Sequence, residues 1–283
     1  MKYFDAHSHY HDRKFSKDRH ELLDKLQRSD VAYVVDCFGM DKLNFGLSLA
    51  KKYPFYYICI NAHGWEKILD QYAKEDFDIK KHGPLVDAPI DEAVATLKNL
   101  CKENKKIVAY GECYIDFRKT EKTPAEVAKR SFVFSKDLEI ARRVGLPPVI
   151  HSGNADNESF EIIKKADMPD YGHGKGMMHC YLGPPKMALD YIDMGYLISI
   201  TGLVTHRSAH GKNLVEVVKR IPLSHMIIET DCPYLTPEPF RHKRNDSGLL
   251  RLTIEAIAEL KNVSPQEVAE ITTSNAKALY KIK

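Results

Sequence analysis

The sequence lacks the marks of a secreted or membrane-bound protein. Its six cysteines form no C-x-x-C pair and no framework spacing, which is typical of free thiols in a reducing cytosol. No apolar run approaches the roughly 20 residues that span a membrane. The first residues contain no basic segment followed by an apolar stretch, as a secretory signal would. These absences predict a cytoplasmic protein with no membrane contact.

The chain also has no large excess of charge of either sign. Lys and Arg number 42 against 39 Asp and Glu, and the net charge of +3 excludes the strongly basic surface of a DNA-coating protein while allowing a local basic patch. No linker or low-complexity segment interrupts the 283 residues, and a hydrophobic fraction of 43% is ample for a large core. We expect one domain over residues 1–283 and infer no obligate protein partner.

Short β-rich runs alternate with helical patterns along the chain. The predicted strands are 2–7, 31–36, 55–60, 107–112, 147–151, 176–180, 196–200 and 225–230. The segments TPAE at 123–126 and SPQE at 264–267 are N-terminal helix signals, and the second opens a last helix expected to end near Tyr280. Residues 73–89 read as a loop after the third strand. This alternation predicts an α/β fold of the (β/α)8 TIM-barrel type, regular or distorted, with a doubly wound open sheet as the alternative.

Side chains that bind metals follow the apolar part of strand after strand. His7 and His9 are two residues apart in the first strand and therefore share a face, with Asp5 one step deeper. The further runs that end in an imidazole or a carboxylate lead to His63, Glu112, His151, His179 and Asp231. Because the C-terminal ends of barrel strands meet at one rim, where active sites lie, these side chains are expected to converge.

Six of these side chains suit a pair of divalent cations. One catalytic zinc normally takes three protein ligands and keeps a position for water, so four imidazoles and two carboxylates exceed the needs of one ion. The first ion is assigned His7, His9, Glu112 and Asp231, and the second Glu112, His151 and His179, with Glu112 as the bridge. Paired ions about 3.5–4 Å apart are usual for phosphoester cleavage by an activated hydroxide, with Asp231 as the general base. These ligands accommodate zinc, manganese or, less readily, magnesium.

The same segments make the chain similar to the TatD family of metal-dependent deoxyribonucleases, within the amidohydrolase-like superfamily. The matching segments are FDAHSH (4–9), GE (111–112), PVIHS (148–152), MHCYLG (178–183), ETDCPYLTP (229–237), RHKRN (241–245) and SNA (274–276). The resemblance implies a divalent-metal hydrolase that cleaves phosphodiesters on a distorted barrel. It also implies single-stranded DNA ends as the substrate and 3′-exonuclease character.

The departures from the family pattern concern the surroundings of the metal positions. Tyr114 stands where the family has a glycine, and Gly153 stands where an arginine follows His-Ser. The segment NAHGW at 61–65, which contains Gly64, lacks a proline and a second histidine of the family pattern. The segment NDS at 245–247 replaces Asn-Glu-Pro. All six metal positions keep the family's residue types. The resemblance therefore supports the metals more directly than the substrate.

Candidate substrate contacts follow from the position of phosphate sites in barrels, which often lie beside the loops after strands seven and eight. The candidates are His63, His206, Arg207, Arg241 and Arg244. The alternative for the arginines is a solvated position or an ion pair with Glu238 or Asp246. Trp65 and Tyr114 could stack on a base, and packing of Trp65 within its own loop is the alternative.

Several other polar residues are expected to stay outside the site. Cys113, Cys180 and Cys232 each follow a proposed ligand, and the alternation of a strand turns them toward the helices. Glu229 is expected to be solvated or ion-paired. His11 and His20 are expected on the surface.

Two other functions remain open at this point. A related metallohydrolase acting on an amide or ester, such as an aminoacyl linkage, is favoured by the near-neutral charge and the missing arginine. A catalytically silent metal-binding protein is disfavoured by the complete ligand set.

Overall fold

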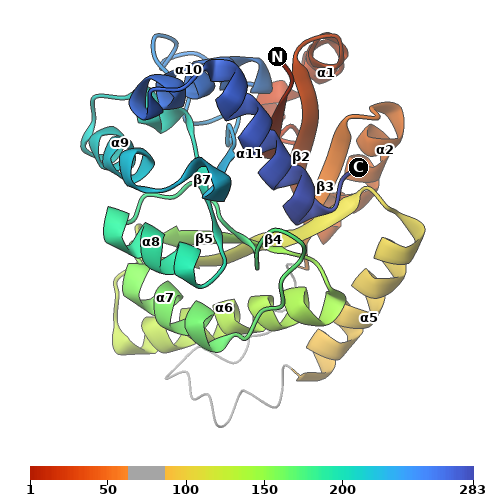
Figure 1. Ribbon diagram of the computed structural model, residues 1–283. Coiled ribbons are helices and arrows are strands. Elements are labelled where there is room, and N and C mark those ends of the chain that lie inside the picture. The colour runs from red at the N-terminus through yellow and green to blue at the C-terminus, as the bar shows by residue number, and fades with distance from the viewer. Residues whose placement is uncertain (63–86) are drawn as a thin grey trace.

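A computed structural model of the chain describes residues 1–62 and 87–283, and Figure 1 shows its architecture. In this part of the chain, eight parallel strands form one sheet in sequence order. The strands are β1 (Tyr3–Ser8), β2 (Val31–Gly39), β3 (Tyr56–Asn61), β4 (Ile107–Asp116), β5 (Pro148–Gly153), β6 (Met177–Met178), β7 (Leu197–Ile200) and β8 (Met226–Ile228). The predicted (β/α)8 barrel is confirmed, and the open doubly wound sheet is wrong because neighbouring strands are consecutive in sequence.

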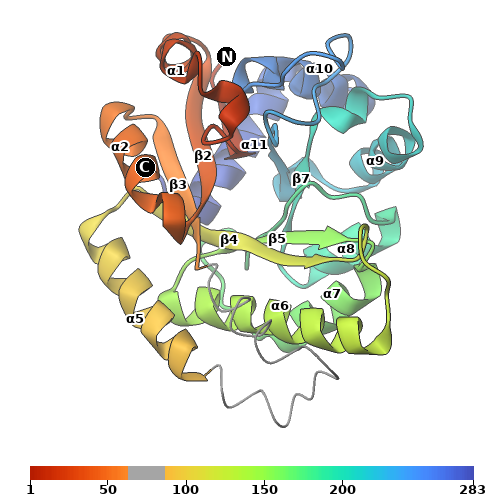
Figure 2. The same ribbon diagram turned by 180° about the vertical axis from the view of Figure 1, so that it is seen from behind.

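Helices surround the strands on the outside, as both ribbon views show (Figures 1 and 2). Within the described ranges they are α1 (Arg19–Gln27), α2 (Leu43–Lys52), α5 (Asp87–Glu103), α6 (Pro124–Val144), α7 (Asp156–Lys165), α8 (Pro185–Asp193), α9 (Ala209–Arg220), α10 (Leu250–Lys261) and α11 (Pro265–Tyr280). The loop predicted for 73–89 is wrong at its end, because α5 begins at Asp87. The rest of that prediction, together with His63 and Trp65, lies outside the described residues.

Local sequence signals begin α6 and α11 where they were expected. The Thr123 hydroxyl accepts from the Glu126 amide at 3.3 Å, and the Ser264 hydroxyl accepts from the Glu267 amide at 3.1 Å. A proline occupies the first turn of each helix, where its missing amide hydrogen has no cost. The last helix ends at Tyr280, as predicted.

Two strands differ from their predicted bounds in ways that affect the rim. β6 comprises only Met177–Met178, so His179 lies just beyond a short strand. β4 runs four residues further than expected and ends at Asp116. Since side chains alternate along a strand, this extension places Asp116 on the same face as Glu112.

The seam between β1 and β8 is joined at the rim by backbone hydrogen bonds. The Asp231 amide donates to the His7 carbonyl at 3.1 Å, and the His9 amide donates to the Cys232 carbonyl at 2.8 Å. Both bonds involve predicted ligands or their neighbours. Closure of the barrel therefore also brings the first and last ligands of the chain together.

Asp5 strengthens this seam from below. Its fully buried carboxylate accepts hydrogen bonds from the Thr230 amide at 2.9 Å, from the Thr230 hydroxyl at 2.6 Å and from the Ser247 hydroxyl at 2.6 Å. Burial raises the pKa of Asp5 to about 7 despite these donors. The side chain that was expected one step below His7 thus links β1 to the segment after β8.

The last helix packs against β1 and β8 through polar side chains as well as apolar ones. The Asn275 amide group donates to the carbonyls of Leu223 and Met226 at 2.9 and 2.8 Å, and the Tyr280 hydroxyl donates to the Ala6 carbonyl at 3.0 Å. Asn275 belongs to the SNA segment that resembles the TatD pattern, and its contacts give that segment a structural role.

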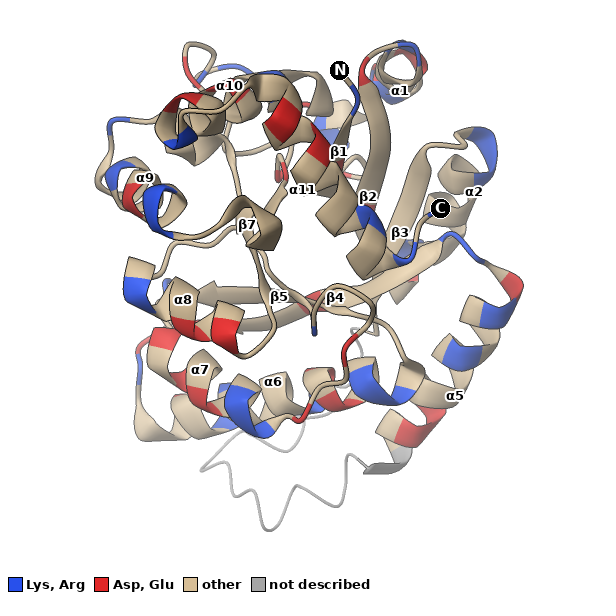
Figure 3. Ribbon diagram, in the orientation of Figure 1, with Lys and Arg blue, Asp and Glu red and all other residues tan. Residues whose placement is uncertain are grey.

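Charged residues of both signs are intermixed on the outer helices (Figure 3). This distribution agrees with the small net charge of +3. Among the described residues, none of the helices combines the length and the apolar character that crossing a membrane requires.

Candidate metal centre

The six predicted ligands lie together at the C-terminal rim of the barrel. The Nε2 atoms of His7 and His9 are 3.1 Å apart, and each is 3.5 Å from Oε1 of Glu112. Oδ1 of Asp231 is 3.1 Å from Nε2 of His9 and 3.8 Å from Nε2 of His7. We call His7, His9, Glu112 and Asp231 the first donor group.

The other oxygen of Glu112 faces a second set of imidazoles. Oε2 of Glu112 is 3.4 Å from Nδ1 of His151, and Glu112, His151 and His179 each offer a ligand atom within 4.8 Å of the others. We call these three residues the second donor group. Glu112 directs one oxygen to each group, which is the arrangement expected of a bridging carboxylate.

The donor atoms fit divalent cations with nitrogen and oxygen ligands. Nδ1 of His151 is buried and has no hydrogen-bond partner among the described residues, whereas its Nε2 lies 3.2 Å from Oδ2 of Asp116. A histidine that binds a metal through Nδ1 carries its proton on Nε2, where Asp116 is placed to accept it. The close approach of imidazole nitrogens and carboxylates suits zinc or manganese coordination.

Glu229 is fully buried, and the expectation that it is solvated is wrong. Its Oε1 lies 3.0 Å from Nδ1 of His179 and accepts a hydrogen bond from the Cys180 amide. The pairing alternative therefore holds, and His179 keeps Nε2 available as a ligand atom, 3.9 Å from Oδ1 of Asp231. Ligand atoms of His7, His179 and Glu229 also lie within 4.8 Å of one another, but the contact with His179 already occupies one Glu229 oxygen.

The imidazoles and carboxylates shift one another's pKa in the metal-free centre. Burial lowers the pKa of His9, but Asp231 and Glu112 outweigh it and raise that pKa to about 9. Burial also lowers the pKa of His179, but the Glu229 carboxylate outweighs it and raises that pKa to about 10. For Glu112 and Asp231, burial raises the pKa, but the neighbouring imidazoles outweigh it and hold both carboxyls below their usual range. A cation that binds here must therefore displace protons.

Asp116 and Arg118 belong to the site and were missed in the sequence. Nε of Arg118 donates to Oδ2 of Asp116 at 2.7 Å, and Nη2 of Arg118 lies 2.9 Å from Nε2 of His151. A side chain at Gly153 would collide with the Asp116 carboxylate. The position where the family has an arginine therefore has no room for one, and Arg118 brings a guanidinium to His151 instead. Extending β4 by its alternating pattern would have revealed Asp116.

Asp36 supports the loop that carries His9 and His11. This fully buried carboxylate accepts from the Ser8 and Tyr56 hydroxyls at 3.0 and 2.6 Å, and it lies 3.5 Å from Nδ1 of His11. The His11 ring is partly buried, with its centroid 5.5 Å from that of His9. The expectation of a surface position is wrong for His11.

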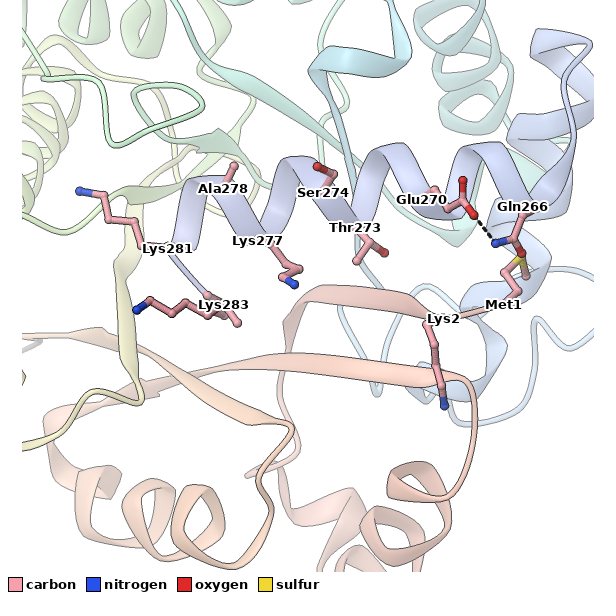
Figure 4. A pocket seen from close by; sticks show the side chains of 11 residues that line it. Met1, Lys2, Gln266, Glu270, Thr273, Ser274, Lys277, Ala278, Lys281 and Lys283 are labelled. Atoms are coloured by element: carbon pink, nitrogen blue, oxygen red, sulfur yellow. Dashed lines mark hydrogen bonds between the residues drawn. The ribbon is translucent and has the colours of Figure 1, made fainter.

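A cavity of about 450 Å³ opens beside the first donor group. Its lining includes His9, Glu112, His11, Phe38, Lys42 and Tyr114. A larger cavity of about 880 Å³ lies between α11 and the start of β1 (Figure 4), where Lys2 and Lys277 line it and the six ligands do not. We place the site at the smaller cavity, because the donor groups converge there.

The predicted substrate residues have varied surroundings. His206 is buried, and its Nε2 lies 2.9 Å from the Thr236 carbonyl. Arg244 is paired with Asp18 at 2.6 Å, a different carboxylate from the two considered in the sequence. The exposed side chains are Arg207 and Arg241. Phosphate contact by these residues stays a prediction.

Tyr114, which was considered for stacking on a nucleobase, contacts the ring of His151. Its ring stacks on that of His151, with centroids 5.0 Å apart and planes 21° apart. It also lines the smaller cavity. Tyr114 thus contacts both this cavity and His151 of the second donor group.

Comparison with known proteins matches residues 4–281 to the model of the family described as TatD related DNase. The uncharacterized metal-dependent hydrolase YabD of Bacillus subtilis is 33% identical over 281 residues, which cover 99% of each chain. The uncharacterized metal-dependent hydrolase TatD of Mycobacterium tuberculosis is 36% identical over 201 residues, which are 70% of this chain and 74% of that protein.

Solved structures share the fold at lower identity. The TatD homologue YJJV of Escherichia coli superposes with a TM-score of 0.78 at 20% identity, covering 99% of this chain and 98% of that chain. An uncharacterized amidohydrolase of Saccharomyces cerevisiae gives a TM-score of 0.80 at 14% identity, covering 99% of this chain and 100% of that chain. These likenesses bear on the barrel alone.

Proposed function

Since the chain belongs to the TatD related DNase family of metal-dependent hydrolases, we propose that it is a two-ion phosphodiesterase that removes nucleotides from the 3′ end of single-stranded DNA. The family match motivates DNA as the substrate class. The observation that carries the two-ion proposal is the position of Glu112, whose oxygens lie 3.5 Å from His7 and 3.4 Å from His151. A carboxylate shared in this way suits two cations at phosphoester-cleaving distance.

The proposed roles of the protein groups follow from their contacts. Divalent ions, when bound to these donors, supply a Lewis acid for the phosphoryl oxygens and lower the pKa of water. Asp231 accepts the proton of the attacking water, because its carboxylate is ionised and lies beside the His9 imidazole of the same donor group. Glu112 connects the two donor groups, because it directs one oxygen to each. Glu229 and Asp116 orient the His179 and His151 rings.

The backbone around Asp231 directs this carboxylate. Asp231 has a φ of +55°, which is uncommon for a residue other than glycine and marks a conformation held by its surroundings. Its amide donates to the His7 carbonyl, and its carbonyl accepts from the Tyr234 amide at 3.0 Å. The general base is thus fixed from both sides by the seam and the following loop.

The cavity beside the first donor group supports a nucleotide as the bound unit. Its volume of about 450 Å³ is in the range of small-ligand sites. Phe38, His11 and Tyr114 supply aromatic surface for a base, and Lys42 supplies a cation for a phosphate. We propose that these side chains contact the terminal nucleotide of the substrate.

The test is release of nucleotides from end-labelled single-stranded DNA with Mn²⁺. We expect shortening from the 3′ end, loss of activity with a chelator, and a fall in kcat on the order of 10²–10⁴-fold in Asp231→Asn, because the proton acceptor is gone. Asp193→Asn, at an exposed position of α8, is the matched control and should behave as wild type. Retention of activity in Asp231→Asn, or release from the 5′ end only, would contradict the proposal.

An amide or ester substrate is the second candidate. It is favoured by the engagement of Arg244 with Asp18, which leaves one fewer cation for a phosphate. Hydrolysis of aminoacyl esters or cyclic amides, without action on any phosphodiester, would support it. Tight metal binding with no turnover in the same panel would point instead to a silent metal-binding protein.

A further inference from the structure

We propose that single-stranded DNA leaves the metal centre across a surface formed by two loops, residues 10–18 after β1 and residues 232–246 after β8. We call this surface the basic ridge. The inference rests on the proposed function, since it names the path of the same substrate. It assigns that path to one side of the rim.

Both loops begin at predicted ligands. Residues 10–18 follow His9, and residues 232–246 follow Asp231, whose carbonyl accepts from the Tyr234 amide. Figure 2 shows the short helix η1 (Arg13–Phe15) beside the segment that leads to α10. A single-stranded DNA whose 3′ end is held at the donor groups meets the basic ridge first if it leaves the rim on the β1–β8 side.

Cross-loop contacts make the basic ridge a preformed surface. Arg244 donates to the Lys14 carbonyl at 2.8 Å and pairs with Asp18 at 2.6 Å. The Tyr234 hydroxyl donates to Oδ2 of Asp12 at 3.0 Å. Because these contacts already hold the loops together, little ordering entropy is lost when a ligand binds.

Tyr234 offers a stacking surface on the basic ridge. It is the exposed large hydrophobic side chain among the residues that the structure describes, with 45% of its surface accessible. The ammonium group of Lys14 lies 4.4 Å from the centre of its ring. An exposed ring beside a cation suits a nucleobase followed by its phosphate, and such stacking does not depend on base identity.

The charges of the basic ridge also favour a polyanion. Its exposed cations are Arg13, Lys14, Lys17, Arg241 and Lys243, and none of them forms an ion pair within the described ranges. The two loops also contain four carboxylates. Asp18 is paired with Arg244, Asp12 accepts from the Tyr234 hydroxyl, Asp246 accepts from the Gly248 amide, and Glu238 is half-buried. Exposed cations that form no ion pair bind the phosphate backbone by releasing its counterions.

The lysine-lined cavity of Figure 4 is a less suitable path. It lies at the start of β1, whereas His7 and His9 lie at the end of that strand. Its lining includes no aromatic side chain. The combination of cations, an exposed ring and proximity to the donor groups occurs on the basic ridge.

The experiment measures binding and turnover separately. Binding of a labelled single strand about 12 nucleotides long is followed by fluorescence anisotropy in a chelator, so that no cleavage occurs. Hydrolysis of the same strand and of bis(p-nitrophenyl) phosphate is followed with Mn²⁺. The small diester reports on the metal centre without reaching the ridge. The variants are Tyr234→Ala, Tyr234→Trp and the double reversal Lys14→Glu/Arg241→Glu.

We expect the double reversal to raise Kd and KM for the strand at least about tenfold and to lower the slope of log Kd against log salt by about 0.7 for each lost phosphate contact. Tyr234→Ala should raise Kd severalfold, and Tyr234→Trp should restore it, because stacking needs an aromatic face. The matched control Lys164→Glu/Lys165→Glu changes the same charge at the far end of α7 and should bind as wild type.

The outcomes separate this inference from the proposed function. Wild-type binding in both Tyr234→Ala and the double reversal overturns the basic ridge and leaves the phosphodiesterase intact. An equal loss on the small diester also overturns it, because the damage then lies at the metal centre. If the wild type cleaves neither substrate, the proposed function fails, whatever the anisotropy shows.

Discussion

The two halves of the metal centre are supported in different ways. At the β1–β8 seam, the segments that carry the ligands are supported by the carboxylates of Asp5 and Asp36. Both are fully buried and accept several hydrogen bonds. At β4 and β5, the groups behind His151 are Asp116 and Arg118, and the Arg118 side chain is 52% exposed. At the seam both supporting groups are therefore buried, whereas at β4–β5 the buried Asp116 carboxylate is paired with a guanidinium that solvent reaches.

This difference indicates a division of labour. The buried carboxylates at the seam serve the barrel as much as the ligands, since Asp5 also joins β1 to the segment after β8. Buried Asp116 and half-exposed Arg118 both contact His151, so their side chains join the end of β4 to β5. Changes at the β4–β5 half should alter metal affinity with little effect on the fold.

Glu112 belongs to both halves, so its loss should have the largest effect. In Glu112→Gln the bridge loses its charge, and we expect binding of both ions to weaken and phosphodiesterase activity to fall on the order of 10³-fold or more. Metal content by mass spectrometry and activity on end-labelled DNA measure the two effects. Glu161→Gln, at an exposed position of α7, is the control. A variant that retained two ions and near-normal activity would remove Glu112 from the centre.

Asp116→Asn should weaken metal binding at the second donor group and leave the first donor group unchanged. An amide can still hydrogen-bond but no longer pairs with His151 and Arg118 as an anion, so we expect metal affinity of the second donor group to fall about 10–100-fold. Thermal unfolding of the metal-free protein should stay close to wild type. Calorimetric titration with Mn²⁺ would show one weakened site and one unchanged site. Equal weakening of both sites would show that the halves are not independent.

The smallest change, about tenfold for each pH unit, is expected in the dependence of metal affinity on pH. The pKa values of about 9 for His9 and about 10 for His179 lie above the ordinary value of 6.5. Their protonation therefore stabilises the metal-free fold fully below pH about 6.5, and this contribution is lost as the pH rises through 9 and 10. Because a metal needs neutral imidazole, affinity should rise by up to about tenfold per pH unit above neutrality for each proton released.

Titration calorimetry in two buffers of different ionisation enthalpy would count the released protons. Each donor group contains one of these two imidazoles, so both ions should show the dependence. The expectation fails if affinity is flat between pH 7 and 9.

Several features of the site were readable from the sequence because they depend on local order. An apolar run that ends in a histidine or a carboxylate predicts both a buried strand and a ligand at its end, and His151 and Asp231 follow this pattern. Asp116 was missed because the strand was predicted to end at Glu112, although the alternation through Cys113 and Ile115 continues the strand pattern beyond it. For Glu229 the sequence left a solvated and an ion-paired position open, because charge alone does not tell a buried carboxylate from a solvated one, and the pairing with His179 holds.

The sequence by itself determined the order of strands and helices, the helix starts at Thr123 and Ser264, and the set of side chains at the strand ends, because each depends on nearby residues. Only the tertiary structure decided that Glu112 faces both donor groups, that Asp116 rather than an arginine fills the space beside Gly153, and that Arg244 is paired with Asp18. These features depend on strand register and on closure of the barrel between β1 and β8. Such contacts join residues distant in the chain, and no local pattern records which of them will meet.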